Sequence, residues 1–508
     1  MSTISGSNRS TAEPGKLGVE LNGINVIAEE ERKGAPRDLF WPWFAANISV
    51  LAIPYGAFIL GFKVSFWQAA IAGVVGVILS FALCGVVALA GKRGSAPTMV
   101  LSRAAFGVDG NRLPALLSWI LLVGWETVLV SLSALATATV FTELGWGGGT
   151  FTKIVAFLVT AALVVFAGVL GFDVIMRLQA VITVATAVLT VAFIATTVDE
   201  VHWGKISGLG SGSTQGFIGA LALVATGFGV GWANTAADYS RYLPRSASSR
   251  GVFGWTTLGG ALAPIVLVVY GIMLVASKDG LGDKVSADPI GALTTLLPTW
   301  FLVPFAIVAI LGLVGGAVLD IYSSGLALLT LGVKVPRPVA AGIDGVIMIA
   351  GSIYVVFVAD SFFVPFQGFL ITVGVPIAAW AGVFVADLLL RRRPYADAEL
   401  YDSRGRYGSV TGPAVALVVV GSIVGWGLVT NGLADWLTWQ GYLLKPFGLG
   451  GKAGAWAYAN LGVFAAFAIG FVGWLLLGRS TVRRQEGTES TPGIGGAEGV
   501  AGTGSVRA

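Results

Sequence analysis

Cysteine and histidine are almost absent from this chain of 508 residues, which contains only Cys84 and His202. A single cysteine excludes a disulfide framework, and one histidine beside one cysteine excludes a metal site built from these residue types. Charged residues make up 11% of the chain, whereas about a quarter is usual in soluble proteins. The net charge of +4 is small and dispersed, so no nucleic-acid partner is expected. These scarcities exclude an ordinary soluble domain, and neither metalloenzyme chemistry nor a cofactor is expected.

The abundant residues are apolar: 55% of the chain is hydrophobic, 72 residues are glycine, and the mean hydropathy is +0.83. A bilayer core about 30 Å thick needs about 20 apolar residues per helix, and the sequence supplies such runs repeatedly. Seven are free of charged residues: 65–91, 154–172, 178–198, 251–277, 361–386, 407–434 and 453–478. Five more are less plain: 43–62, 113–142, 217–237, 300–331 and 339–359. The sequence therefore predicts an all-α integral membrane protein with twelve transmembrane helices.

The distribution of lysine and arginine predicts how these spans are oriented. An even number of spans puts both termini on one side, and that side holds 24 of the 31 basic residues, against seven on the other. Because basic residues favour cytoplasmic loops, both termini are expected in the cytoplasm and the protein in the cell membrane. The polar ends, residues 1–38 and 479–508, are expected to be disordered cytoplasmic arms.

Two of the predicted spans are interrupted at corresponding places. The first contains Pro54 and Gly56, and the sixth contains Gly227 within a Gly-Phe-Gly-Val-Gly run. Proline removes a backbone donor and glycine weakens a helix, so these positions are expected to be hinges or unwound points. Interruptions five helices apart predict inverted repeats over residues 39–198 and 199–390, followed by peripheral helices in 391–478. Close helix packing is the alternative reason for the glycines.

Ionisable residues within spans are candidates for function. A carboxylate at the bilayer centre costs about 2.5–3.5 kcal/mol, so Glu126 in the third span and Asp320 in the eighth each need a cavity, a partner or a proton. Both are candidates for proton coupling, although either could be satisfied by a structural hydrogen bond. Asp238 and Arg241 close the sixth span and are expected to form a structural or gating ion pair. Asn47, in the first span, could bind a polar solute or link two helices.

Several motifs resemble the nucleobase:cation symporter-1 family of cytosine, purine, allantoin and hydantoin permeases, and in particular the cytosine permeases. They are Trp-Phe-Ala-Ala-Asn at 43–47, Pro-Tyr-Gly at 54–56, Ser-Arg-Ala-Ala-Phe-Gly at 102–107, Gly-Trp at 124–125 and Ala-Asp-Tyr-Ser-Arg-Tyr-Leu-Pro at 237–244. The last is the most specific. The resemblance covers about residues 38–480 and implies a LeuT-like fold of five plus five inverted helices with two peripheral helices.

The resemblance also implies a binding site for a flat heterocycle, whose ring is held between an aromatic residue of helix three and the unwound part of helix six. Aromatic faces suit such a ring, with a few polar groups fixing its edge. By position, the implied residues are Trp125, Phe228, Gly229, Gly231, Trp232 and Asp320, the last where relatives usually have asparagine. From the residues themselves, Glu126 and Asn47 join this predicted substrate site.

Two departures from the family pattern bear on the coupling ion. Glu126 directly follows Trp125, and the next helical turn offers Leu129 where relatives often have an amide. Helix eight also lacks the side-chain oxygens that sodium-coupled members carry before the polar residue. Sodium would then depend on backbone carbonyls, namely those near Asn47, Val50, Leu311, Val314 and Gly315. Proton coupling through Glu126 or Asp320 is therefore favoured.

The expected function is import of a nucleobase-like heterocycle, cytosine or a purine, by proton or sodium symport, without enzymatic chemistry. Within the same fold, the alternatives are hydroxymethylpyrimidine, allantoin, a hydantoin, or a small amine or amino acid. A membrane channel is the alternative from a different class.

Overall fold

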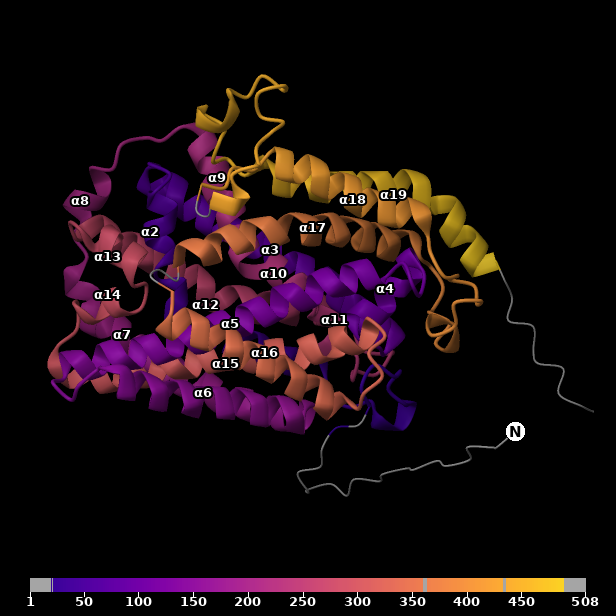
Figure 1. Ribbon diagram of the computed structural model, residues 1–508, viewed down its shortest axis with the longest axis horizontal. Helices are drawn as coiled ribbons and strands as arrows, with labels where there is room; N and C mark the ends of the chain where they lie inside the picture. Colours follow the sequence, from indigo (N-terminus) through magenta and orange to yellow (C-terminus); the bar gives the residue numbers. More distant parts are fainter. Residues whose placement is uncertain (1–19, 21, 360–362, 433–434, 488–508) are drawn as a thin grey trace, which may run out of the picture.

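The structure is a computed structural model that describes residues 20, 22–359, 363–432 and 435–487 (Figure 1). Within these ranges all regular elements are helices, in agreement with the predicted all-α class. They are α1 (Phe40–Asn47), α2 (Tyr55–Leu60), α3 (Phe66–Gly94), α4 (Thr98–Phe106), α5 (Arg112–Glu143), α6 (Thr150–Leu170), α7 (Phe172–Thr197), α8 (Trp203–Ser207), α9 (Thr214–Ala225), α10 (Gly231–Ala233), α11 (Ala236–Ser240), α12 (Ser249–Ser277), α13 (Leu281–Ala287), α14 (Gly291–Thr294), α15 (Leu302–Thr330), α16 (Arg337–Phe357), α17 (Phe363–Leu390), α18 (Gly412–Gly427) and α19 (Leu461–Gly487).

Ten helical segments in the described part of the chain are long and apolar enough to cross a membrane. A further crossing is formed if the bent pair at Pro36–Asn47 and Val50–Leu60 counts as one span, and α18 is a shorter apolar helix. The predicted runs thus correspond to helices, while the total of twelve spans stays a prediction. A helix satisfies its backbone polar groups with its own hydrogen bonds, which is what an apolar run needs in order to cross a membrane.

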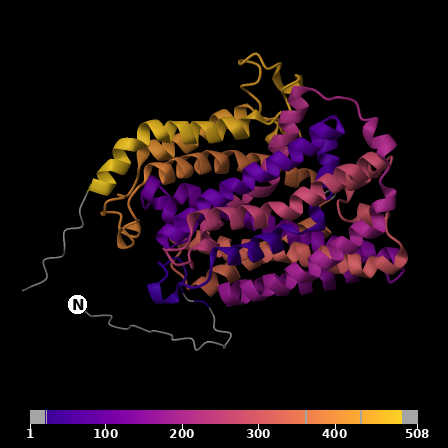
Figure 2. The same ribbon diagram turned by 180° about the vertical axis from the view of Figure 1, so that it is seen from behind.

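The long helices run side by side and give the bundle two ends (Figure 1). We call the end that carries residues 22–39 and the loop 391–411 the terminal face, and the end that carries α8, α13 and α14 the opposite face. Helices α18 and α19 pack against α17 at one edge of the bundle, as both views show (Figures 1 and 2). The predicted site residues lie on α1, α5, α10 and α15 and on the turn Thr226–Val230 that precedes α10.

Glycine lets the backbones of α2 and α12 come into contact. A Cβ atom on Gly56 would lie 2.2 Å from the carbonyl carbon of Gly271 in α12, and one on Gly271 would lie 2.1 Å from the carbonyl oxygen of Ile53. Small residues allow such approach, which is a main source of helix association inside a membrane. Gly56 lies within α2 and is not unwound. Gly56 is therefore not the unwound point that the sequence suggested, and its lack of a side chain serves packing.

The described part of the N-terminal segment is folded against the terminal face, which corrects the prediction of a disordered arm over residues 1–38. The amide of Ile27 donates to the carbonyl of Ser95, and the amide of Lys33 donates to that of Tyr242, each over 2.8 Å. These contacts supply partners for backbone groups that an unpacked arm would leave to water. Residues 1–19 and 21 lie outside the described residues.

Helix α19 extends beyond the predicted end of the last span at residue 478 and reaches Gly487. Its last turn is held by the buried side chain of Gln485, whose Oε1 accepts a hydrogen bond of 2.8 Å from Arg391. The beginning of the predicted C-terminal arm is thus ordered by a tertiary contact, and residues 488–508 lie outside the described residues.

Candidate functional site

The first crossing is broken near its middle. Helix α1 ends at Asn47, residues 48 and 49 are non-helical, a single 3₁₀ turn follows at Val50–Ala52, and α2 begins at Tyr55. The two halves are bent by 65°. Pro54 is the residue that precedes α2, a place where its missing N–H does no harm. The predicted interruption is therefore present, but it begins about two turns before Pro54.

The sixth crossing is broken at the predicted glycines. Helix α9 ends at Ala225 and passes into a π-helical turn at Thr226–Val230, inside which Phe228 has non-helical angles of φ −115° and ψ −111°. Short helices α10 and α11 complete the crossing. Gly227 adjoins the break, and a Cβ atom there would lie 2.3 Å from the hydroxyl oxygen of Tyr55. Gly227 is therefore required for the close approach of the two broken crossings.

The two breaks border a central chamber of about 60 Å³. Its walls come from the first crossing, α5, the broken sixth crossing and α15. The lining residues are Ala46, Asn47, Ser49, Leu51, Ala52, Tyr55, Trp125, Leu129, Gly227, Phe228, Gly231, Trp232, Gly312, Gly316 and Asp320. Sequence analysis placed six of these residues in a substrate site, and the structure brings those six together: Asn47, Trp125, Phe228, Gly231, Trp232 and Asp320.

Four aromatic rings line the chamber, and the polar side chains of Asn47, Ser49 and Asp320 line it too. Asp320 is 2% exposed, and its Oδ2 has no hydrogen-bond partner among the described residues. Asn47 donates through Nδ2 to the carbonyl oxygen of Trp43 over 2.8 Å, which holds its amide at the end of α1. A Cβ atom on Gly231 would meet no atom closer than 3.5 Å, where the nearest include Nε1 of Trp125. The chamber therefore combines ring faces with an unpaired carboxylate oxygen.

Two predicted substrate ligands do not line this chamber. Gly229 faces α3: its amide donates to Oγ of Ser80 over 3.1 Å, and a Cβ atom would lie 2.2 Å from the Ser80 carbonyl carbon. Glu126 is fully buried on the other side of α5, beside Ser324 and Asp344. Successive helix positions are about 100° apart, so the side chains of Trp125 and Glu126 leave α5 in different directions, and only Trp125 lines the chamber.

Glu126 is an unusual buried carboxyl group. Neither of its oxygens makes a hydrogen bond within the described part of the chain, although the Ser324 hydroxyl lies close enough to interact. A buried carboxylate without partners is costly, and neutralising it with a proton removes most of that cost. The arrangement is suited to proton exchange rather than to binding the edge of a heterocycle.

The predicted sodium-binding carbonyls lie where α1 approaches α15. The carbonyl of Gly315 accepts a hydrogen bond of 2.7 Å from Nε2 of Gln179 in α7. The carbonyl of Val50 accepts one from the amide of Ile53 over 3.1 Å. Both oxygens are thus already engaged, while Leu311 and Val314 lie in the regular part of α15.

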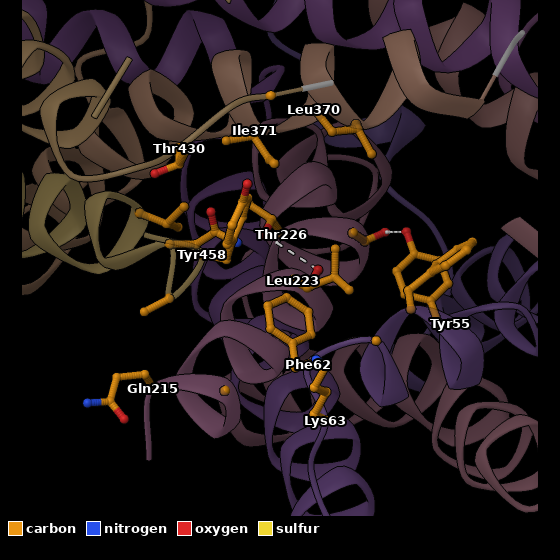
Figure 3. Close-up of a pocket in the computed structure, with 18 of the residues that line it drawn as sticks. Tyr55, Phe62, Lys63, Gln215, Leu223, Thr226, Leu370, Ile371, Thr430 and Tyr458 are labelled. Atoms are coloured by element: carbon orange, nitrogen blue, oxygen red, sulfur yellow. Dashed lines mark hydrogen bonds between the residues drawn. The ribbon is translucent and has the colours of Figure 1, made fainter. Parts of the chain in front are cut away.

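A second and larger cavity, of about 600 Å³, opens toward the opposite face (Figure 3). Phe62, Lys63, Gln215, Leu370, Ile371, Thr430 and Tyr458 lie around it. We call this larger cavity the vestibule. Tyr55 and Gly227 line both the vestibule and the central chamber. The ring of Tyr55 lies 4.7 Å from that of Phe228, centroid to centroid, and its hydroxyl is 3.5 Å from the Gly227 carbonyl oxygen. Tyr55 therefore separates the vestibule from the chamber.

The predicted ion pair between Asp238 and Arg241 does not form. Asp238 accepts hydrogen bonds from the amide and hydroxyl of Thr98, over 2.7 and 2.8 Å. Arg241 instead pairs with Glu20 of the N-terminal segment, over 2.9 Å. The two residues are three positions apart, a spacing that would allow a pair on one helix face, but each side chain is bound by a different neighbour. The partner of Arg241 comes from a distant segment that the local spacing could not reveal.

Glu20 links several elements at the terminal face. Its carboxylate accepts hydrogen bonds from Arg241, from the Tyr242 hydroxyl over 2.6 Å and from the amide of Phe172 over 2.9 Å. Burial alone would raise the pKa of Glu20, but the nearby charges of Arg241 and Arg337, with these hydrogen bonds, lower it overall. The carboxylate is therefore stabilised in its charged form, and it holds the N-terminal segment to the ends of α7 and α11.

Sequence reasoning missed Gln179, Ser324, Asp344, Tyr55 and Glu20. A signal existed for two of them: Gln179 and Asp344 lie inside predicted spans, where a polar side chain is unusual and often functional. Tyr55 stands in a motif that resembles the permeases but carries no polar signal of its own. Glu20 lies in a segment with the composition of a disordered arm, so no local pattern indicates its partners.

The class of protein follows from this geometry: a bundle of apolar helices, two of them broken around a chamber that one side chain separates from a vestibule, defines a membrane transporter. The structure is similar to that of Mhp1, a nucleobase-cation-symport-1 family transporter, in a closed conformation with bromovinylhydantoin bound. The TM-score is 0.65 at 19% identity, over 93% of this chain and 100% of that one. A Na⁺-coupled sialic acid symporter in an outward-open state is similar with a TM-score of 0.58 at 11% identity, over 91% and 93%. The expected LeuT-like fold is confirmed.

The sequence places the chain within one family of transporters. The family model described as permease for cytosine/purines, uracil, thiamine, allantoin matches residues 26–444, and the chain belongs to that family. YxlA of Bacillus subtilis, named as a purine-cytosine permease, is 24% identical over 403 residues, 77% of this chain and 84% of that protein. The purine-cytosine permease fcyB of Emericella nidulans is 25% identical over 275 residues, about half of each chain. Family and fold are those of membrane transporters and not of enzymes.

Proposed function

We propose that this permease imports a nucleobase-like heterocycle, cytosine or a purine, across the cell membrane together with a proton. The observation that carries the proposal is the chamber at the two helix breaks, where Trp125, Phe228 and Trp232 surround a space that Asp320 also faces. Ring faces suit a flat aromatic solute, and the unpaired Asp320 oxygen suits an N–H group on its edge. The distribution of lysine and arginine favours a cytoplasmic position for the terminal face.

Two observations favour the proton over sodium. Helix α15 offers no side-chain oxygen between Gly312 and Gly316, and the Gly315 carbonyl is occupied by the amide of Gln179. Sodium requires several oxygen ligands in place of its water. In contrast, Glu126 and Asp320 are buried carboxyl groups with unpaired oxygens, and protons are the cations that such groups bind readily.

Transport would proceed by alternating access. Tyr55 closes the chamber toward the vestibule, and on the other side Trp43 packs edge-to-face on Trp232 and on Tyr239, with ring centroids 5.8 and 5.5 Å apart. Opening one closure while the other holds would carry the solute from the vestibule to the terminal face. The substrate shifts the equilibrium between the state open to the vestibule and the state open to the terminal face only as far as its affinities for the two states differ.

The proposal is tested by uptake of radiolabelled cytosine and adenine in a host that lacks nucleobase transport. We expect saturable accumulation that persists without sodium and disappears with an uncoupler. Glu126→Gln is expected to lose accumulation while retaining part of the substrate binding, and Glu143→Gln, at the exposed end of the same helix, serves as the matched control. Competition by amines but not by nucleobases would reject the substrate, and normal accumulation in Glu126→Gln would reject its coupling role.

The same assay separates the other candidates. Hydroxymethylpyrimidine, allantoin and hydantoins are offered as unlabelled competitors, because Mhp1 has a hydantoin bound in the same fold. A small amine or amino acid would be favoured by the carboxylates alone. Flux that rises linearly with concentration, without counterflow, would indicate a channel.

A further inference from the structure

The helices α5, α15 and α16 enclose a polar group that neither the chamber nor the vestibule uses. Asp344, in α16, is fully buried. Its Oδ1 accepts a hydrogen bond of 2.8 Å from Nε1 of Trp119, and its Oδ2 accepts one of 3.0 Å from the hydroxyl of Ser324. Two neutral donors therefore satisfy the Asp344 carboxyl group. Its hydrogen bonding does not require another acidic residue, such as Glu126, beside it.

Glu126 and Asp320 connect this group to the chamber. Glu126 is fully buried, and neither of its oxygens has a hydrogen bond among the residues described. Its polar neighbours are Asp344, Ser324 and Asp320. Asp320 faces the chamber and lies one helical turn from Ser324 in α15, and residues four apart share a helix face. The order from the chamber is therefore Asp320, Glu126, Ser324 and Asp344.

The series ends nearer the terminal face than it begins, since Asp320 lies ten positions before the last residue of α15, about 15 Å along the helix. Asp344 lies seven positions from the first residue of α16, about 10 Å along the helix, whereas Glu126 lies fourteen positions from the start of α5, about 21 Å. Both helices begin at the terminal face with the arginines Arg337 and Arg112. These are the only basic residues of α5, α15 and α16, so no lysine or arginine of these helices is placed to neutralise the carboxyl groups.

We propose that Asp320, Glu126, Ser324 and Asp344 form a proton path from the central chamber toward the terminal face. The inference rests on the proposed proton symport and names the residues through which the proton leaves the site. A serine hydroxyl has one hydrogen and two lone pairs, so it can accept and donate at once.

Each step of the path conserves protons. Protonated Asp320 first passes its proton to the Glu126 carboxylate. Glu126 then gives a proton to Oγ of Ser324 while Ser324 gives its own hydroxyl hydrogen to Oδ2 of Asp344. Glu126 is left as a carboxylate and Asp344 as a carboxylic acid, whose remaining lone pairs still accept from Trp119. When Asp344 later releases its proton toward the terminal face, the Ser324 hydroxyl can turn to the Ile321 carbonyl, 3.3 Å away.

The experiment uses the full-length protein in vesicles with a pH-sensitive dye inside and radiolabelled cytosine or adenine, whichever the unaltered protein carries, outside. The measured quantity is the number of protons carried per substrate. We expect Ser324→Ala and Asp344→Asn to lower this ratio at least tenfold and to lose accumulation driven by a pH gradient. Ser324→Thr, which keeps the hydroxyl, should restore both.

Ser323→Ala is the matched control, because the Ser323 hydroxyl contacts Tyr239 and no carboxyl group of the path. A merely structural role would lower both fluxes together and leave their ratio unchanged. A ratio in Ser324→Ala and Asp344→Asn equal to that of the unaltered protein would overturn the path, and if Asp344→Asn does not fold, the Ser324 variants decide alone. If the unaltered protein carries the nucleobase without protons, proton symport itself fails, which is seen before any variant is tested.

Discussion

The indole Nε1 of Trp426 donates a hydrogen bond of 2.7 Å to the carbonyl oxygen of Thr372. Thr372 lies four positions before Pro376 in α17, and proline has no N–H to offer that carbonyl. The peripheral helix α18 thus supplies the donor that the proline removes. Nε2 of Gln440 also donates to the hydroxyl of Thr372 over 2.8 Å. Leu370 and Ile371 of α17 line the vestibule. Trp426 and Gln440 therefore stabilise α17 next to this part of the helix, where Pro376 leaves a carbonyl without its helical partner.

Trp426→Phe is expected to destabilise the protein because it leaves the Thr372 carbonyl without a donor while keeping an aromatic ring. An unsatisfied buried acceptor costs about 1–3 kcal/mol. The midpoint of thermal unfolding in detergent should therefore be lower for Trp426→Phe than for the unaltered protein. Trp436→Phe, at a residue that is 70% exposed, is the control. Equal midpoints for Trp426→Phe and the unaltered protein would show that the hydrogen bond contributes nothing.

Glu20→Gln is expected to weaken the closure of the terminal face in a pH-dependent way. Breaking a buried ion pair costs about 3–5 kcal/mol, so the variant should unfold at a lower temperature than the unaltered protein at pH 7. The pKa of Glu20 is lowered in the folded protein. Its contribution is therefore fully present above the unfolded pKa of about 4.3 and is lost as the pH falls through the folded pKa.

The difference between the two proteins should consequently be large at pH 7 and shrink below about pH 4, by the linkage of proton binding to stability. Thermal unfolding at a series of pH values measures it. Glu30→Gln, at an exposed position in the same segment, should show no such dependence. A Glu20→Gln protein that is as stable as the unaltered one at pH 7 would contradict the proposed role of the ion pair.

The sequence was sufficient for much of the fold and for six of the fifteen residues that line the chamber. Long apolar runs predicted the helices because a membrane span leaves no choice of secondary structure. The break at Gly227 was predicted from local glycines, and Trp125 and Asp320 from the family resemblance. Glu126 was predicted as a substrate ligand because it is an acidic residue inside a span, but in the structure it lies beside Ser324 and Asp344 and does not line the chamber.

What could not be predicted depends on contacts between distant segments. The pairing of Arg241 with Glu20 joins positions 221 apart in the sequence, and the hydrogen bond from Gln179 to Gly315 joins positions 136 apart. The sequence instead suggested Asp238 as the ionic partner of Arg241. It also suggested that the Gly315 carbonyl would be available to a sodium ion. Glycine also has two roles that sequence does not distinguish, since Gly227 adjoins a break while Gly56 serves packing within a helix.

Gln179→Ala tests whether the amide of Gln179 takes the place of a cation. In the unaltered protein we expect the midpoint of thermal unfolding to be the same in sodium chloride and in choline chloride, since the Gly315 carbonyl is occupied. In Gln179→Ala the carbonyl loses its partner, at a cost of about 1–3 kcal/mol, and sodium becomes able to restore part of the stability. Thr196→Ala, in the same helix and farther along it, is the control. A midpoint in the unaltered protein that rises with sodium would instead support sodium binding.

Gly227→Ala tests the separation of the chamber from the vestibule. The added Cβ atom would lie 2.3–2.8 Å from the hydroxyl and ring of Tyr55, so the ring must move from its place between the cavities. Overpacking of this kind costs about 1–3 kcal/mol, and we expect nucleobase uptake to fall about tenfold or more. Replacing Tyr55 by alanine in the same protein removes the clash and should recover part of the uptake that Gly227→Ala loses.

The two substitutions should therefore be strongly non-additive, as contacting residues are in a double-mutant cycle. The rate of substrate counterflow in the four proteins measures the coupling. Gly254→Ala, at a position in α12 where a Cβ atom would meet nothing within 4 Å, should behave like the unaltered protein. If Tyr55→Ala and Gly227→Ala instead reduce transport by independent factors, the contact between them does not control passage, and the barrier between vestibule and chamber must lie with other residues.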